Sequence, residues 1–328
     1  CIRDRAEDVC LAIDPEDREK VVSSGSPRLD LLRPELREFF RQQAERLRAR
    51  HGRFILVNSN FHRFNHFLGR GAYLRDLKAR GKVPDAEREA FFQQWIDFLG
   101  EMYQAFVSML RALSAAFPDR LIVLRPHPSE DHEAWRRDLA GLGNVEVRHE
   151  GSALPWLLAC DVLIHNSCAT GIEAFVMGVP VIAYRPLRSE TYDSFLPNAV
   201  SREARTEPEL LVLVQALVAG EPIGEDAAAQ ETRQLARHFF SGLDGPLASE
   251  RIVGTLGRLQ VPARPFARNP VHAWARRRAL RLWPPARTWL RRAAKGPNPL
   301  AEYLRQKFTG LEVAEVQQDL ERLREVSG

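Results

Sequence analysis

Three short polar segments contain the side chains of this sequence that are best suited to bind or transform a ligand. They are Asn58-Ser59-Asn60, Arg125-Pro126-His127-Pro128 and His165-Asn166-Ser167-Cys168-Ala169-Thr170, and each directly follows a run of apolar residues. Imidazole, amide and hydroxyl groups donate hydrogen bonds to phosphate oxygens, and imidazole also transfers protons near neutral pH. The pattern therefore indicates a site for a phosphate-bearing ligand.

The third segment lies where a helix is expected to begin. A helix start presents free N–H groups and a partial positive charge, which together bind phosphate, and the hydroxyls of Ser167 and Thr170 add donors. We assign Asn166 and Cys168 to the same nucleotide-binding turn. Glu173 follows one turn later, at a distance suited to accepting hydrogen bonds from ribose hydroxyls. In the alternative, the hydroxyls only cap the helix and Glu173 is a solvated surface residue.

His127 is held between two prolines, which fix the backbone and remove competing N–H donors. We expect its imidazole to contact a phosphate or to transfer a proton, and we expect Arg125 to help bind the nucleotide. The alternative is a histidine that only satisfies a loop carbonyl. A further polar patch at this rim is expected to contact the ligand, unless it consists only of loop-forming side chains: Asn58, Asn60, Asn65 and Glu130.

Short apolar runs alternate with helical patterns along most of the chain, which is typical of a parallel sheet covered on both faces. A strand end is expected at Val21-Val22, followed by strands at 54–57, 121–124, 145–147, 162–164 and 179–183. Expected helices are 34–48, 85–116, 154–158, 170–177, 224–239 and one that begins at Thr206 with Glu209 in a capping box. We predict a Rossmann-like α/β fold, with the three polar segments on the carboxyl edge of its sheet.

The composition fits a folded chain of one large domain or two smaller ones. Of the 328 residues, 45% are hydrophobic and 27% are charged, which excludes wholesale disorder. The sequence contains no GxGxxG, Walker A or HExxH motif, so dinucleotide, P-loop and zincin chemistry have no support. The four cysteines lack zinc-site spacing, and we expect Cys160 and Cys168 to be packing residues rather than nucleophiles. We expect no metal and no obligatory cofactor.

The C-terminal region differs in charge from the rest of the chain. Residues 262–296 contain ten Lys or Arg, no Asp or Glu, and three tryptophans, whereas the remainder is net acidic. We expect this segment to bind an anionic membrane surface, with packing on another domain as the alternative and nucleic acid disfavoured. A final helix is predicted from an apolar stripe at Val313, Val316, Leu320 and Leu323.

We divide the chain into three regions. Residues 1–50 are expected to be the remnant of an N-terminal half with a hinge and linker helix. Residues 51–260 are expected to form a nucleotide-sugar-binding domain, and 261–328 a basic helical tail.

The run from Gly171 to Ala183 resembles the acidic helix and Gly-x-Pro-Val strand in the C-terminal, donor-binding half of GT-B glycosyltransferases, where Glu173 matches a glutamate that contacts ribose. More narrowly, the chain resembles bacterial surface-carbohydrate biosynthesis proteins related to transferases that use CMP-activated keto-sugars such as Kdo. This resemblance covers residues 20–260 and a tail motif, and rests on Gly25–Asp30, Leu56–Phe61, Arg125–Glu130, Leu163–Thr170 and Lys307-Phe308.

The resemblance implies transfer of a Kdo-like sugar from a CMP-sugar to a glycan or lipid-linked acceptor of a capsule or lipopolysaccharide. The reaction would take place at the cytoplasmic face of the inner membrane. The resemblance also implies that His127 holds the CMP phosphate beside Ser167 and Thr170. Asp30 is the only matched acid near the expected cleft and is the candidate catalytic carboxylate. Because only 24 residues precede Gly25, we expect the acceptor-binding half to be missing from this chain.

Two other families resemble the chain less well. UDP-GlcNAc 2-epimerases share the His-Pro strand end and the helix glutamate, but Asn166-Ser167-Cys168-Ala169 replaces their Asp-Ser-Gly-Gly run. CDP-glycerol transferases are more distant relatives. A UDP-GlcNAc 2-epimerase-like enzyme and a non-catalytic nucleotide-sugar-binding module are therefore kept as alternative functions.

Overall fold

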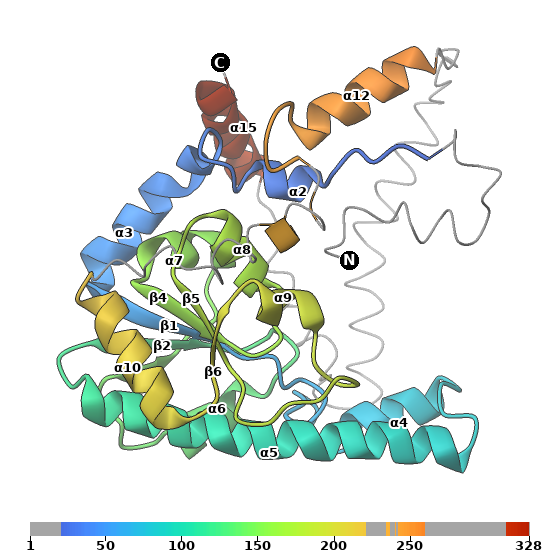
Figure 1. Ribbon diagram of the computed structural model, residues 1–328, viewed down its shortest axis with the longest axis vertical. Coiled ribbons are helices and arrows are strands. Elements are labelled where there is room, and N and C mark those ends of the chain that lie inside the picture. Colours follow the sequence, from blue (N-terminus) through green and yellow to red (C-terminus); the bar gives the residue numbers. More distant parts are fainter. Residues whose placement is uncertain (1–20, 221–233, 237–239, 241, 260–312, 328) are drawn as a thin grey trace.

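The computed structural model describes residues 21–220, 234–236, 240, 242–259 and 313–327. Within them, six strands form one parallel sheet in the order β3-β2-β1-β4-β5-β6 (Figure 1). The strands are β1 (Phe54–Asn58), β2 (Leu121–Arg125), β3 (Val145–Val147), β4 (Val162–His165), β5 (Val181–Tyr184) and β6 (Arg202–Ala204). The predicted α/β, Rossmann-like fold is confirmed.

Helices cover both faces of this sheet (Figure 1). Those near the N-terminus are α2 (Pro27–Asp30), the 3₁₀ helix η2 (Arg37–Phe40), α3 (Arg41–His51), α4 (Ala72–Ala79) and α5 (Ala86–Ala116). The central helices are α6 (His132–Asp138), α7 (Ala153–Ala159), α8 (Thr170–Val176) and α9 (Phe195–Ala199). The last described helices are α10 (Glu207–Val218), α12 (Ala248–Arg258) and α15 (Val313–Ser327).

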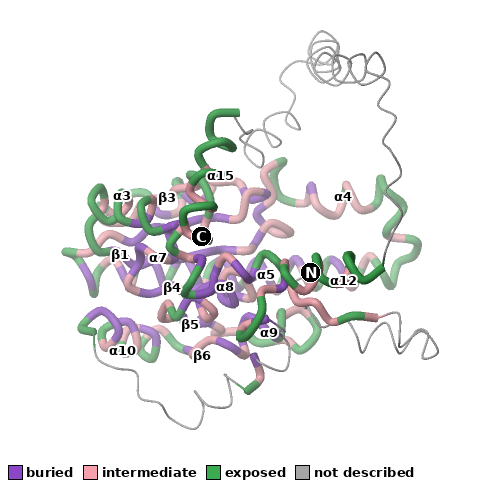
Figure 2. Tube along the Cα trace, turned by 90° about the horizontal axis from the view of Figure 1, so that it is seen from above, coloured by how far each residue is buried: buried purple, intermediate pink, exposed green. Residues whose placement is uncertain are grey.

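The apolar runs form strands because both of their faces are buried. Every residue of β1, β4 and β5 is buried, and alternate side chains enter two separate clusters, as the period of two requires. Ile55 and Val57 pack with α5 and α10, whereas Phe54 and Leu56 pack with α3, α7 and α8. Figure 2 shows the buried strands inside, with α12 and α15 largely exposed.

Several elements differ from the sequence prediction. Residues 21–22 form no strand, and Val22 is 53% exposed. The helix expected at 34–48 is η2 followed by α3. The edge strand β6 was not predicted because Arg202-Glu203-Ala204 is charged and short, and its strand conformation comes from pairing with β5. The short helices α4, α6, α9 and α12 were also missed.

The predictions for the C-terminal part of the chain are only partly tested. The final helix is confirmed as α15, although its stripe residues Val313, Val316 and Leu320 are exposed. Most of the helix expected at 224–239 and the whole basic segment 262–296 lie outside the described residues. Among the described helices, none is both long and apolar enough to cross a membrane. The proposed region boundaries stay predictions.

The sheet brings the three polar segments to one edge. Asn58 at the end of β1 is in register with Arg125 of β2 on one side and with His165 of β4 on the other. The strand order reverses between β1 and β4, so the connections diverge there. Such a switch point at the carboxyl edge is where open α/β sheets bind ligands.

Candidate functional site

Asn58 links the end of β1 to the start of α8. Its Nδ2 donates to Oγ1 of Thr170 at 2.9 Å, and Oγ1 of Thr170 donates to Sγ of Cys168 at 3.1 Å. The Asn58 side chain is buried, and its Oδ1 has no hydrogen-bond partner in the described structure. Predicted site residues that follow β1 and β4 therefore contact each other, and Oδ1 of Asn58 is the acceptor that remains without a donor.

Glu173 is a buried residue of α8, only 4% exposed, so the alternative of a solvated surface glutamate is wrong. Its Oε1 forms an ion pair with Arg28 of α2, whose side chain is largely exposed. Burial raises the pKa of the Glu173 carboxyl, and Arg28 opposes the rise. The second oxygen, Oε2, is buried and has no partner among the described residues.

A third such acceptor belongs to Asn166, at the end of β4, whose Oδ1 is buried and unpartnered in the described part of the chain. We use the name rim site for Asn58, Asn166, Thr170 and Glu173. An acceptor that is buried without a donor costs about 1–3 kcal/mol, so such atoms need an explanation. The three unpartnered oxygens of the rim site are the atoms that a ligand with N–H or O–H groups would satisfy.

Ser167 is held by α9 in a conformation that non-glycine residues seldom adopt, with φ of 48°. Its N–H donates to Oδ1 of Asn198 at 3.0 Å, and Nδ2 of Asn198 donates back to Oγ of Ser167 at 3.0 Å. The amide of Ser194 also donates to this hydroxyl oxygen. The hydroxyl therefore accepts from the protein and keeps its own hydrogen for donation.

The buried ring of His165 holds the turn between β4 and α8 in place. Its Nδ1 accepts from the Cys168 amide at 3.3 Å, and its Nε2 lies 2.8 Å from Oγ of Ser201. Burial lowers the pKa of His165 to about 3, so the ring is neutral at pH 7. A Cβ on Gly171 would lie only 2.4 Å from Nε2 of this ring, which explains glycine at that position.

These contacts change how the start of α8 can bind phosphate. The sequence prediction relied on free N–H groups, but the amides of Ser167 and Cys168 already donate within the protein. The helix is also only seven residues long. These two amides are therefore not available to a ligand, whereas the Ser167 hydroxyl keeps its hydrogen for donation. Burial raises the pKa of the Cys168 thiol, which agrees with its predicted lack of nucleophilic reactivity.

His127 has a defined tautomer. Its Nδ1 accepts from the amide of Ser129 at 3.1 Å, so the hydrogen of the neutral ring lies on Nε2. The ring lies beside that of His62, with centroids 4.9 Å apart, and Nδ1 of His62 lies 3.1 Å from Oδ1 of Asn60. Nδ1 of His127 therefore does not donate to a loop carbonyl, and Nε2 is the ring nitrogen that carries the hydrogen.

Glu130 lies beneath the rim and connects two loops. It is fully buried, and its carboxylate accepts from the Ser59 hydroxyl, the Phe61 and His127 amides and the Trp135 indole at 2.8–3.1 Å. Burial raises the pKa of this carboxyl, against the effect of the four donors. These bonds make Glu130 a support for both loops, and its predicted contact with a ligand stays untested.

Three other predicted residues also bond within the protein. Nδ2 of Asn65 donates to the carbonyl of Asp131 at 3.0 Å. The buried Arg125 guanidinium donates to two carbonyls of the β3–α7 loop at 2.7 and 3.1 Å, and burial lowers its pKa to about 10. Asp30 accepts from the Ala248 and Ser249 amides and the Ser249 hydroxyl at 2.8–2.9 Å, which caps α12. Their predicted contacts with a ligand stay untested.

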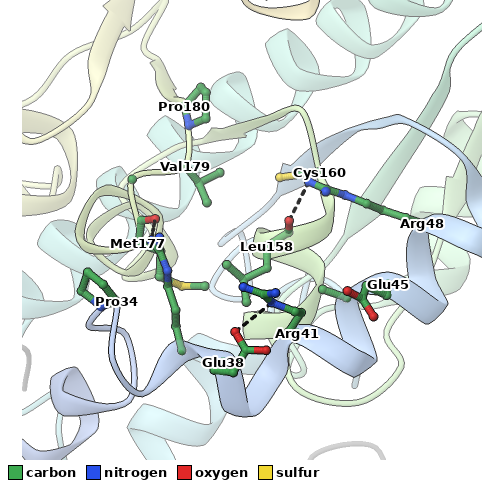
Figure 3. Close-up of a pocket in the computed structure, with 13 residues that line it drawn as sticks. Pro34, Glu38, Arg41, Glu45, Arg48, Leu158, Cys160, Met177, Val179 and Pro180 are labelled. Atoms are coloured by element: carbon green, nitrogen blue, oxygen red, sulfur yellow. Dashed lines mark hydrogen bonds and ion pairs between the residues drawn. The ribbon is translucent and has the colours of Figure 1, made fainter. Parts of the chain in front are cut away.

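A cavity of about 560 Å³ lies at the opposite, amino-terminal end of the sheet (Figure 3). We call it the arginine cavity because Arg37, Arg41 and Arg48 line it. Arg48 donates to the last carbonyls of α7 at 2.9 and 3.0 Å, Arg37 donates to the Met177 carbonyl at 2.7 Å, and Arg41 pairs with Glu38. Arg37 and Arg48 thus bind carbonyls at the C-terminal ends of α8 and α7, and Arg41 is balanced by a carboxylate.

The described residues hold no group of three or more His, Cys, Asp and Glu that could bind a metal. The expectation of metal-independent chemistry stays a prediction. Sequence analysis did not single out two residues that shape the site. Arg28 stood only within the Gly25–Asp30 motif, and Asn198 follows a proline in a short helix that gives no periodic signal.

No family model matches the chain, and no curated protein matches it by sequence. Solved structures with a similar course of the chain include the wall teichoic acid polymerase TagF with CDPG, at 15% identity and a TM-score of 0.43. They also include UDP-GlcNAc 2-epimerases from Neisseria meningitidis (14%, 0.41) and Methanocaldococcus jannaschii (13%, 0.39), both with UDP-GlcNAc.

These matches cover 76–79% of this chain but only 55–60% of the solved chains. At such identities and TM-scores the likeness concerns the course of the chain and carries no argument about chemistry. The function therefore has to be argued from the residues of the rim site.

Proposed function

We propose that this chain is the donor-binding half of a glycosyltransferase and that a nucleotide sugar binds at the rim site. The observation that carries the proposal is the set of three buried acceptors without donors: Oδ1 of Asn58, Oδ1 of Asn166 and Oε2 of Glu173. A nucleoside offers ribose hydroxyls and base N–H groups, which are the donors that these oxygens lack.

In the proposed complex, Glu173 accepts from the ribose hydroxyls while Arg28 compensates its charge. The phosphate lies at the start of α8, where the hydroxyl of Ser167 donates to it. The Nε2–H of His127 donates to another phosphate oxygen. Donors placed where negative charge develops on the departing nucleotide favour its release, and this requires no metal.

The resemblance to CMP-dependent keto-sugar transferases makes a CMP-sugar, with a Kdo-like group, the favoured donor. An unpartnered amide oxygen that faces the base would favour cytosine, whose 4-amino group donates, over uracil, whose 4-oxygen accepts. The acceptor in this proposal is a surface glycan or glycolipid. The anionic membrane surface stays the proposed partner of residues 262–296, which lie outside the described residues.

Calorimetric titration with CMP, CDP and UDP tests the proposal. We expect CMP to bind with a micromolar Kd, and we expect Glu173→Gln and His127→Ala each to weaken binding by about tenfold or more, which is about 1.4 kcal/mol. Glu133→Gln is the control because Glu133 is exposed on α6. Stronger binding of UDP would favour the epimerase-like alternative. If no nucleotide binds, the proposal fails.

A further inference from the structure

Arg63, in the loop after β1, carries a charge that the described protein does not balance. Its guanidinium carbon lies 4.0 Å from the ring centroid of Trp95 in α5 and 5.6 Å from that of Tyr73 in α4. Its Nε is buried without a partner. Within the described residues, its guanidinium makes no ion pair or hydrogen bond.

Two other arginines at this edge of the sheet are neutralised by carboxylates, and the guanidinium of a third, Arg125, donates to two backbone carbonyls. Arg28 pairs with Glu173, and Arg185 pairs with Asp193 and with Glu203. Arg63 is instead held by aromatic rings, which stabilise a cation and its orientation but leave its charge available. A fixed, half-buried guanidinium without a carboxylate is therefore a site for an anion.

The rings connect Arg63 to the rim. Tyr73 lies 6.0 Å from the His62 ring, and the His62 ring lies 4.9 Å from that of His127, measured between centroids. The helices that supply Tyr73 and Trp95, α4 and the first half of α5, extend beyond the carboxyl ends of the strands (Figure 1). Arg63 thus lies on the ligand side of the sheet, two rings away from the proposed phosphate donor.

Trp95 also connects the rings around Arg63 to the loop between β5 and α9. Trp95 stacks with Tyr192 at 5.8 Å and an interplanar angle of 15°. Tyr192 belongs to the loop between β5 and α9, and α9 supplies the Asn198 that holds Ser167. The aromatic surface therefore lies between two loops that contribute to the proposed binding site, and its rings are all half-buried rather than closed off.

We propose that Arg63, with Tyr73 and Trp95, forms a subsite for a second anionic group of the substrate, beyond the phosphate that joins nucleotide and sugar. The group is a carboxylate or a phosphoryl group, whose two oxygens match the paired N–H donors of a guanidinium. This inference rests on the proposed function. It narrows the substrate class to acidic sugars or phosphorylated donors.

Calorimetry with CMP, CMP-N-acetylneuraminate and CDP separates the sources of the anion. For a sugar carboxylate, Arg63→Gln weakens binding of CMP-N-acetylneuraminate by about tenfold and binding of CMP by less than twofold. For a second phosphoryl group, the same selective loss affects CDP. Arg70→Gln is the matched control, because the exposed Arg70 also lies over a ring, that of Phe64, at 4.8 Å. Equal effects on all three ligands, or equal effects of both variants, would overturn the subsite.

A second measurement tests the subsite without the nucleotide. Saturation-transfer NMR with free N-acetylneuraminate, methyl phosphate and glucose should show binding of at least one anion, lost in Arg63→Gln and partly retained in Arg63→Lys. Absence of any binding that depends on Arg63 would reject the subsite even if CMP binds. Binding of an anion together with failure of CMP would reject the proposed function and leave the subsite intact. Circular dichroism checks that each variant is folded.

Discussion

The two ends of the sheet use polar residues in opposite ways. At the amino-terminal end, the arginine cavity contains charged side chains that are engaged with helix carbonyls or a carboxylate. At the carboxyl end, the rim site is mostly uncharged, yet three buried oxygens lack donors. The cavity has a volume of about 560 Å³, whereas the rim is marked by three neighbouring oxygens without donors. These three oxygens, rather than volume or charge, are therefore what makes the rim the candidate site.

The largest expected effect comes from Glu130, which supports the rim from beneath. Glu130→Ala removes the acceptor of four buried donors and should lower the free energy of unfolding by about 3 kcal/mol or more. Glu45→Ala, at the exposed edge of the arginine cavity, should change it by less than about 0.5 kcal/mol. Urea denaturation measures both. Similar values for the two variants would contradict the role given to Glu130.

Protonation of His165 should weaken the rim as the pH falls. Burial lowers the pKa of His165 to about 3 in the folded protein, against 6.5 when unfolded. Between these values the unfolded state binds more protons, so stability rises with pH, by up to about 1.4 kcal/mol per pH unit for one group. Protonation would put a hydrogen on Nδ1, which faces the Cys168 amide.

Denaturation at pH 7, 6 and 5 checks this prediction. Other histidines with lowered pKa, such as the half-buried His149 at about 4, add to the slope. The difference between the wild-type protein and His165→Gln therefore isolates the contribution of His165. A stability that does not depend on pH between 5 and 7, or an unchanged slope in the variant, would argue against a neutral buried ring.

The smallest effect is expected in the arginine cavity. Arg48→Ala removes two bonds to the end of α7 and should cost about 1 kcal/mol of stability. CMP affinity should be unchanged, because the cavity lies at the other end of the sheet. A loss of nucleotide binding in this variant would argue for the cavity, and against the rim, as the binding site, and would remove the contrast between the two ends.

Much of the fold was predictable because apolar runs and helical periods are local signals. The strand ends at Asn58, Arg125 and His165 were placed on one edge from the sequence, and their register confirms this placement. The strand β6 was not predictable, since Arg202-Glu203-Ala204 becomes a strand only by pairing with β5. Local propensity cannot show such an effect of tertiary structure.

The site was less predictable than the fold for a related reason. Sequence indicates which side chains reach an edge, but not which of them are already bonded there. Glu130 and Asn58 both have side chains typical of ligand contacts. Only packing shows that Glu130 is surrounded by four donors and that Asn58 retains a free acceptor. Nothing in the sequence indicated a role for Arg63, because the aromatic rings that contact it, those of Tyr73 and Trp95, come from two later helices.

The cap that Asp30 forms on α12 has a consequence for the order of folding. The bond joins residues separated by 218 positions, so it closes only after the intervening sheet has brought the two segments together. A chain synthesised as far as residue 247 contains every strand of the sheet but leaves the buried Asp30 carboxylate without these donors. This contact thus fastens α2, near the beginning of the described chain, to α12, which follows the whole sheet in the sequence.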